Sequence, residues 1–215
     1  MKIIIPGRKA SKGLPFKNRK LFFQTADIIP HDIRHDVWVT SDDSLLETKA
    51  KQHNFNFIKR PESLSQDTTS IRDVLVHALN QILPDPDEII LLLYLTYPER
   101  TWEHVNNALK FFKDQHINSN ATSMLCKKEI KTNPYLCLHE HGVDGIYGKQ
   151  IIPHDLYRRQ DYPKCFEISH YVCFFQASAI NKLNKNMYGE STVFYTIPDV
   201  IDVDSQRELD EFTNR

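Results

Sequence analysis

The run Glu88–Leu95 (EIILLLYL) is the most continuously apolar segment of the chain, and it constrains the fold more than any other feature. Such a run is too short to cross a membrane, and its unbroken apolar character is typical of a strand buried on both faces. A strand has both faces buried when helices cover the two sides of a parallel sheet. We therefore predict that Glu88–Leu95 is the central strand of an α/β sheet.

Strand-like and helix-like segments alternate along most of the chain, and this alternation predicts a doubly wound, mostly parallel sheet. The other predicted strands are short apolar runs bounded by turn residues, namely Lys2–Pro6, His35–Ser41, Asn56–Lys59, Ser119–Cys126, Ser169–Phe175 and Val193–Val203. The predicted helices are Ser44–His53 with Ser41 or Asp42 as its cap, Ser70–Ile82, Thr101–Asp114 and Ser205–Thr213. Ser70–Ile82 has the clearest helical period.

The stretch from Lys127 to Lys164 interrupts this alternation. It is polar and aromatic, with turn signals at His141–Gly142, Asp144–Gly145 and Tyr147–Gly148. We interpret residues 127–164 as an arm or antiparallel insertion within one domain that spans residues 1–215. A chain of 215 residues is long enough for one such domain and its core.

The composition argues against several classes of protein. With a formal net charge of −1 the chain as a whole is not attracted to nucleic acid or to an anionic membrane, so neither is an expected partner. No run of about 18 apolar residues is present, and the apolar start is too short for a signal-peptide core. The cysteines, which form no Cys-x-x-Cys pair, are expected to be free thiols of a cytoplasmic protein; they are Cys126, Cys137, Cys165 and Cys173.

The loop after the first predicted strand is strongly basic, with six Lys or Arg among the fifteen residues from Pro6 to Lys20. Ligands of open α/β sheets bind at the carboxyl ends of strands, and cationic side chains neutralise phosphate charge there. Gly7 and Gly13 would let backbone amides approach phosphates closely. Composition alone equally allows a solvated basic loop or a nucleic-acid patch, but the position favours a phosphate-binding loop. Neither the P-loop nor the dinucleotide fingerprint is present.

Asp202-Val203-Asp204 lies at the end of the last predicted strand. On a strand, residues two apart point to one face, so the two carboxylates would lie together. Mg²⁺ binds one or two carboxylates plus phosphate oxygens, so the pair predicts a magnesium site beside a triphosphate. The alternative is that Asp204 caps the final helix, with Glu208 nearby. Asp42–Asp43 is a weaker candidate, because acidic pairs commonly open helices.

Six segments carry short motifs that occur together in one enzyme family. In chain order they are Ile5–Asn18 (IPGRKASKGLPFKN), Val39–Asp43 (VTSDD), Lys59–Asp67 (KRPESLSQD), Leu95–Thr101 (LTYPERT), Tyr157–Pro163 (YRRQDYP) and Val200–Asp204 (VIDVD). The corresponding family motifs are IPARGGSKGIPxKN, VSTDD, RRPxxLAxD, PTSPLRT, RQxxP and DID. In these motifs the chain resembles the acylneuraminate cytidylyltransferases, which make CMP-activated sialic and related nonulosonic acids.

The resemblance implies a fold, a reaction and a nucleotide site. The implied fold is nucleotide-diphospho-sugar transferase-like, or Rossmann-like, and the implied reaction moves CMP from CTP to a small acidic acceptor for surface glycan synthesis. The residues implied in binding the nucleotide are Arg8, Ser11, Lys12, Lys17, Asn18, Arg60 and Ser70. Asp202 and Asp204 would hold Mg²⁺, and together with Arg8 and Lys17 they form the implied catalytic set.

The resemblance also implies an acceptor site and a dimer. Arg159 and Gln160 would meet the acceptor, since a planar guanidinium suits a carboxylate. Tyr94, Tyr97 and His170 fall in the same acceptor region. The arm corresponds to the family's dimerisation region, so a homodimer is implied.

The chain departs from the family pattern at three places. Lys9-Ala10 replaces two glycines of the first loop, and Ser169-His170 replaces an Asn-Gly pair. In the central motif Tyr94, Leu95 and Tyr97 replace Gln, Pro and Ser. The nucleotide half is thus largely kept while the acceptor half is rewritten. We therefore hypothesise that the acceptor is another acidic sugar or a small phosphorylated compound, not N-acetylneuraminate.

Two other functions compete with cytidylyl transfer. A nucleotide-sugar-dependent glycosyltransferase also pairs a first-strand loop with an Asp-x-Asp metal site, although its acidic motif usually follows a middle strand. A non-catalytic nucleotide-binding relative would explain the altered motifs. Retention of Arg8, Lys17, Asp202 and Asp204 argues against that second alternative.

Overall fold

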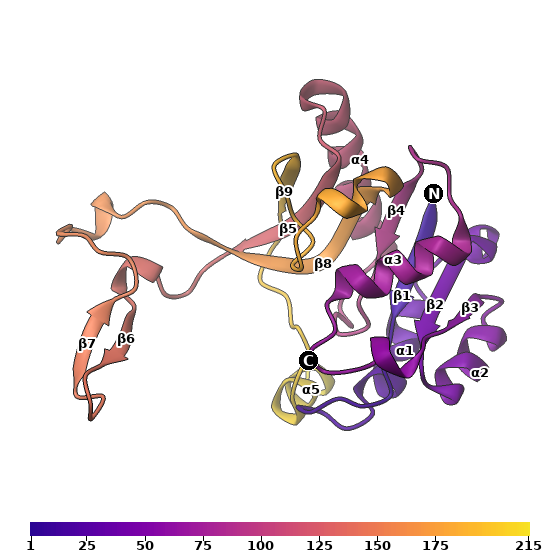
Figure 1. Cartoon of the computed structure of the whole chain (residues 1–215), viewed down its shortest axis with the longest axis horizontal. Coiled ribbons are helices and arrows are strands. Elements are labelled where there is room, and N and C mark those ends of the chain that lie inside the picture. Colours follow the sequence, from indigo (N-terminus) through magenta and orange to yellow (C-terminus); the bar gives the residue numbers. More distant parts are fainter.

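The computed structural model describes all 215 residues, apart from the side chain of Arg159. A seven-stranded sheet has the strand order β3-β2-β1-β4-β8-β5-β9, with β4 at its centre (Figure 1). Its strands are β1 (Lys2–Pro6), β2 (Val37–Ser41), β3 (Asn56–Lys59), β4 (Ile89–Leu92), β5 (Ser123–Glu129), β8 (Phe166–Gln176) and β9 (Thr192–Thr196). All neighbouring strands are parallel except β8, which runs antiparallel to β4 and β5. The predicted mostly parallel sheet is confirmed.

Helices cover both faces of this sheet. They are α1 (Lys17–Ala26), α2 (Ser44–Gln52), α3 (Ile71–Ile82), α4 (Trp102–Ser119) and α5 (Gln206–Thr213), together with the short 3-10 helices η1 (His31–Asp36), η2 (Glu62–Leu64), η3 (Pro134–Leu136), η4 (Arg159–Asp161) and η5 (Ala177–Lys182). Ile3 and Ile5 pack with α1, α2 and α4, whereas Ile4 packs with α3 and η5 on the opposite face. Because alternate residues of β1 and β4 enter different cores, β4 is apolar at every position and β1 is apolar from Ile3 onward.

Several predicted boundaries differ from the structure. β2 begins at Val37, because the residues before it form η1, and α4 continues five residues past Asp114 to Ser119. Neither Ser41 nor Asp42 caps α2: the cap is Asp43, whose carboxylate accepts from the Leu45 amide. The Ser41 hydroxyl instead accepts from the amide of Asp43 itself. β9 ends at Thr196, seven residues before the predicted end at Val203.

The arm consists of the outer ends of β5 and β8 and of a separate two-stranded sheet. β5 and β8 pair as far out as Glu129 and Phe166, and the hairpin of β6 (Leu138–His141) and β7 (Tyr147–Gln150) lies well away from the main sheet (Figure 1). The turn between β6 and β7 contains Gly142 and Gly145 at positive φ, as the turn signals predict, whereas Gly148 lies inside β7. Among the described residues, no helix combines the length and the apolar character needed to span a membrane.

Candidate active site

A cavity opens at the carboxyl ends of the parallel strands β1, β3 and β4. It is lined by residues of the basic loop, of the segment after β3, of the start of α3 and of the segment after β4, among them Arg8, Ser11, Lys17, Asn18, Arg60 and Tyr94. Strands of equal direction end at one edge of a sheet, so loops that are far apart in sequence meet here. The predicted nucleotide residues Lys12 and Ser70 do not line this cavity.

The helix that follows the basic loop begins with an unfavourable arrangement of charge. The first turn of α1 carries Lys17, Arg19 and Lys20 and no acidic residue, and Phe16 at its start provides no side-chain cap. A helix N-terminus already has partial positive charge, so cations placed there repel it and anions stabilise it. Lys17 is paired with Asp204 and Arg19 with Asp43. This end of α1 is therefore suited to bind an anion.

Asp67 is the counter-ion of the rest of the basic loop. Its carboxylate pairs with the Arg8 guanidinium and with the Lys12 ammonium, and both contacts hold the pKa of Asp67 below its usual range. The side-chain amide of Asn18 donates to the Arg8 carbonyl at 2.9 Å, and the backbone amide of Lys9 donates to Asp42 Oδ1 at 2.8 Å. Carboxylates thus hold the loop's cations in the positions where phosphate oxygens would be neutralised.

Arg60 is a buried arginine with one N–H group that has no acceptor. Only 6% of the residue is exposed; its Nη2 donates to the Thr40 carbonyl at 2.7 Å, and its Nε has no acceptor. Burial lowers its pKa to about 10, opposed by nearby Asp42, so the side chain stays charged at neutral pH. Arg60 lines the cavity, so its guanidinium is placed to donate to an oxygen of a ligand there.

Ser70 has a structural role that accounts for its hydroxyl. It is the N-cap of α3, and its Oγ accepts from the Asp73 amide at 3.1 Å. The neighbouring Thr69 and Ile71 line the cavity, whereas Ser70 does not. The geometry therefore gives no support for a direct contact between Ser70 and a nucleotide base.

The two predicted metal ligands lie on a coil, not on a strand. After β9 the chain leaves the sheet edge, and we call residues 197–204 the acidic strap. The strap is fixed beside the segment after β4 by the Val203 amide, which donates to the Thr96 carbonyl at 2.8 Å. The argument that strand periodicity brings Asp202 and Asp204 together was therefore wrong. Both still come to the cavity edge, where Asp204 pairs with Lys17.

The capping alternative for Asp204 was also wrong. Ser205 is the N-cap of α5 and forms a capping box with Glu208. The Glu208 carboxylate accepts from the amides of Asp204 and Ser205, both at 2.8 Å. Since helix capping does not use the Asp204 side chain, that side chain is turned toward the basic loop, and 65% of it is exposed.

Asp202 provides the observation that tests the predicted magnesium site. Its Oδ1 is buried and accepts no hydrogen bond. Burial raises the pKa of the Asp202 carboxyl, the Asp204 carboxylate raises it further, and the hydroxyls of Thr96 and Tyr97 lower it in part. A buried carboxylate oxygen without a donor is suited to a cation. Within the described part of the chain no three acidic, histidine or cysteine side chains gather. Asp202 and Asp204 together offer two carboxylates, a donor set that Mg²⁺ accepts when a ligand supplies further oxygens.

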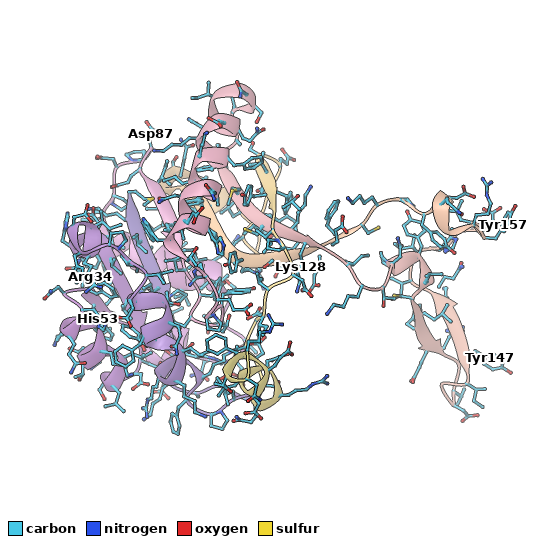
Figure 2. The ribbon with its side chains drawn as sticks, turned by 180° about the vertical axis from the view of Figure 1, so that it is seen from behind. Arg34, His53, Asp87, Lys128, Tyr147 and Tyr157 are labelled. Atoms are coloured by element: carbon cyan, nitrogen blue, oxygen red, sulfur yellow. The ribbon has the colours of Figure 1, made fainter. Side chains whose placement is uncertain are left out.

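The predicted acceptor residues do not all reach the cavity. Tyr94 lines it and meets the His170 ring edge-on, with the centroids 5.5 Å apart. Tyr97 is only 4% exposed and packs against Tyr171 in the core, so its hydroxyl faces Asp202 and not the cavity. Gln160 lies in η4, three residues after Tyr157, which Figure 2 places on the arm far from the sheet. The side chain of Arg159 lies outside the described part of the structure.

Two residues that the sequence analysis did not single out also support the site. One is Asp67, and the other is Arg100, whose fully buried guanidinium donates to the carbonyls of Tyr171 and Tyr94, both at 2.7 Å. Arg100 thereby holds the end of β4, where Tyr94 lies. Their positions in the sequence could have identified them, because Asp67 lies in the motif segment Lys59–Asp67 and Arg100 lies in Leu95–Thr101.

No family model matches this sequence. Two N-acylneuraminate cytidylyltransferases of Streptococcus agalactiae, from serotype V and serotype III strains, are 27% and 26% identical to it over 206 residues. The alignments cover 90% of this chain and 45% of each relative, so the chain spans about half the length of the relatives it matches.

Many solved structures share the fold, among them these three. The CMP:2-keto-3-deoxy-manno-octonic acid synthetase in complex with CTP has a TM-score of 0.68 at 14% identity, covering 99% of this chain and 96% of its own. A cytidylyltransferase from Leptospira borgpetersenii gives 0.57 at 13%, covering 98% and 84%. The 4-diphosphocytidyl-2C-methyl-D-erythritol synthase from Anaerococcus prevotii gives 0.56 at 11%, covering 100% and 99%. The predicted resemblance is confirmed: the chain is a divergent relative of the N-acylneuraminate cytidylyltransferases, with the fold of cytidylyltransferases of known structure.

Proposed function

We propose that this protein transfers CMP from CTP to a small acidic acceptor and releases pyrophosphate. The observation that carries the proposal is the contact between Lys17 of the basic loop and Asp204 of the acidic strap. This contact joins a site suited to a triphosphate to a site suited to a cation, at the edge where α/β sheets bind ligands. The named activities of the relatives and structural neighbours support the same reaction.

In the proposed reaction an acceptor hydroxyl attacks the α-phosphorus of CTP. A bond forms between the acceptor oxygen and the α-phosphorus, the bond to the β-phosphate oxygen breaks, and the hydroxyl proton passes to the solvent. Phosphoryl transfer of this kind depends mainly on positioning and charge neutralisation. Arg8 and Lys17 would supply positive charge to the phosphates, and the Arg60 guanidinium would donate to the base. Asp202 and Asp204 would hold Mg²⁺, which supplies further charge neutralisation when bound.

The acceptor is proposed to be an acidic sugar of the nonulosonic class or a small phosphorylated compound. Tyr94 lines the cavity and His170 packs against it, at positions where the family motifs have other residues. This rewriting supports an acceptor other than N-acetylneuraminate. A screen of CTP with N-acetylneuraminate, 2-keto-3-deoxy-octonate and a phosphorylated polyol, measured as pyrophosphate release, tests this. The hypothesis fails if N-acetylneuraminate has the highest kcat/KM.

A homodimer built through the arm forms part of the proposal. Seven large apolar side chains of the arm are more than half exposed: Leu136, Leu138, Val143, Ile146, Tyr147, Ile151 and Tyr157. Exposed apolar side chains concentrated on one extended segment are typical of a surface that another protein covers. This chain's own Gln160 lies on the arm and does not line the cavity, so the proposal includes an arm contributed by the second copy. The free thiols support a reducing, cytoplasmic setting.

The deciding experiment measures pyrophosphate release with purified protein, Mg²⁺ and the acceptor panel. CTP is compared with ATP, GTP and UTP, because the proposal requires a preference for the cytosine base. A glycosyltransferase would instead release a nucleotide from a nucleotide sugar, and a non-catalytic relative would bind CTP without turnover. Release of pyrophosphate from UTP at the same rate would contradict the proposed choice of CTP.

A further inference from the structure

The acidic strap is held in place by contacts on both sides of Asp202. On one side the Val203 amide donates to the Thr96 carbonyl at 2.8 Å. On the other side the Ile201 amide donates to Glu99 Oε2 at 3.1 Å. The residues on either side of Asp202 are therefore each hydrogen-bonded to the segment after β4. One bond goes to a backbone carbonyl and the other to a side chain. Only the second can be removed by changing a side chain.

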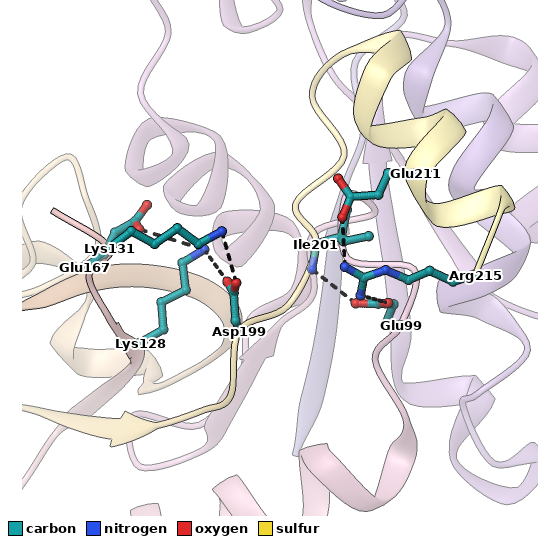
Figure 3. Close-up of polar contacts among 8 residues, drawn as sticks. All are labelled: Glu99, Lys128, Lys131, Glu167, Asp199, Ile201, Glu211 and Arg215. Carbon is teal, nitrogen blue, oxygen red and sulfur yellow. Dashed lines mark hydrogen bonds and ion pairs between the residues drawn. The ribbon is translucent and has the colours of Figure 1, made fainter.

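Glu99 is itself held by a second contact. Its other oxygen, Oε1, accepts from Arg215 Nη1 at 2.7 Å, and Arg215 Nη2 donates to Glu211 Oε1 of α5 at 2.8 Å (Figure 3). Both oxygens of the Glu99 carboxylate are thus used, one for the strap and one for the helix that follows it. Hydrogen bonds from amides and guanidinium groups to a charged carboxylate are the stronger kind.

A competing anchor lies at the other end of the strap. Asp199 pairs with Lys128 at 3.5 Å and with Lys131 at 3.3 Å, at the base of the arm (Figure 3). The Asp199 side chain is 63% exposed, with its partners Lys131 and Lys128 at 89% and 20%. The Glu99 side chain is 26% exposed, with Arg215 at 51%, and Ile201, whose amide it accepts from, is 8% exposed. Exposed ion pairs contribute little, while a carboxylate bonded to the amide of a buried residue is shielded from water. Burial therefore identifies Glu99 as the stronger anchor.

We propose that Glu99 is a positioning residue: through its bond to the Ile201 amide it sets where Asp202 stands in the candidate cation site. Glu99 does not line the cavity, and its carboxylate holds the strap at the Ile201 amide, so it acts on Asp202 through the backbone. The proposal rests on the proposed function only where turnover is the readout.

Three variants separate the possible roles of Glu99. Glu99→Leu removes both contacts, whereas Glu99→Gln keeps one carbonyl oxygen that can accept from the Ile201 amide but loses the charge opposite Arg215. Asp199→Asn is the matched control, because it removes the exposed anchor of the same strap. Thermal unfolding first establishes that each variant is folded.

The first measurement is amide hydrogen exchange of the strap, which needs no activity. We expect exchange at Ile201 and Val203 to be about tenfold faster in Glu99→Leu, and close to wild type in Glu99→Gln and Asp199→Asn. Unchanged protection in Glu99→Leu would overturn the proposal even if the protein were an active cytidylyltransferase.

The second measurement is the Mg²⁺ concentration that gives half-maximal pyrophosphate release. In Glu99→Leu we expect it to rise about tenfold while the KM for CTP changes less than twofold, with recovery in Glu99→Gln. Equal increases in both quantities would indicate a general loss of structure and would contradict a positioning role. If wild type shows no turnover with any acceptor, the proposed function fails, and the exchange measurement still decides the role of Glu99.

Discussion

The Lys17 ammonium at the start of α1 contacts the Asp204 carboxylate on the acidic strap, although the two residues are 187 positions apart in sequence. Lys17 is largely buried, with 13% of its side chain exposed, while Asp204 reaches in from the surface. Gly13 strengthens the same junction, because a Cβ at this position would overlap the Asp204 carbonyl oxygen. The basic loop and the acidic strap therefore form one structural unit at the cavity edge.

Asp204→Ala is expected to reduce Mg²⁺-dependent pyrophosphate release by about a hundredfold or more, because electrostatic groups at a phosphoryl-transfer centre contribute at that scale. The fold should persist, since the Asp204 side chain is mostly exposed and does not cap α5. Steady-state kinetics across a Mg²⁺ titration and circular dichroism check both statements. Asp114→Ala, on the exposed face of α4, is the control. Wild-type turnover in Asp204→Ala would rule out the metal assignment.

Arg60→Lys is expected to raise the Kd for CTP by about tenfold, because lysine cannot both reach the Thr40 carbonyl and present a planar second donor to the cavity. Isothermal titration with CTP measures the effect without needing an acceptor. Arg34→Lys makes the same chemical change at an arginine that donates to the Ile29 carbonyl and does not line the cavity. Equal losses of affinity in the two variants would count against a role for Arg60 in nucleotide binding.

Gly13→Ala and Gly7→Ala form a matched pair. The added methyl at Gly13 meets backbone, the Asp204 carbonyl, and must push the basic loop and the acidic strap apart. At Gly7 it meets Leu46 Cδ1 at 2.8 Å, and that side-chain methyl can move aside. We expect Gly13→Ala to lower kcat/KM by about a hundredfold through misplacement of the site, and Gly7→Ala to cause a clearly smaller loss. The reverse order would show that the junction is not needed.

Asp202→Asn is expected to stabilise the protein near neutral pH in the absence of divalent cations, while abolishing Mg²⁺-dependent turnover. Burial raises the folded-state pKa of Asp202, so between the ordinary and the raised pKa the folded state binds more protons than the unfolded state. This contribution to stability is present at low pH and is lost as pH rises through the raised pKa. Urea unfolding of both proteins checks this: the advantage of Asn should shrink in acid, and a less stable Asn variant at neutral pH would refute the account.

Ile146→Glu is expected to convert the proposed dimer to a monomer, because it places a charge on the exposed apolar surface of the arm. Ile117→Glu is a closely matched control, since Ile117 of α4 is 78% exposed and Ile146 is 77% exposed. Sedimentation velocity distinguishes monomer from dimer directly. A wild-type protein that sediments as a monomer at all concentrations would refute the proposed homodimer.

Much of the fold was predictable because local patterns and tertiary burial agree. The apolar runs of β1 and β4 predicted strands that are buried on both faces, and each of these strands contributes residues to both cores. The period of α3 predicted a helix with one buried face, and that face packs in a single core. Predictions failed where several neighbouring residues could fill the same structural role. Ser41, Asp42 and Asp43 can each cap a helix, and only the backbone path selects Asp43.

The sequence by itself determined which residue types are present: a basic loop after the first strand, an Asp-x-Asp near the end, and motifs in one family order. Only the tertiary structure decided how these meet. In the structure Asp202 and Asp204 lie on the acidic strap and not on a strand, and Ser205 caps the last helix. Tyr97 is buried, and Lys17 pairs with Asp204. The physical reason is that parallel strands bring their carboxyl ends to one edge, so the charges that shape the site come from loops far apart in the chain.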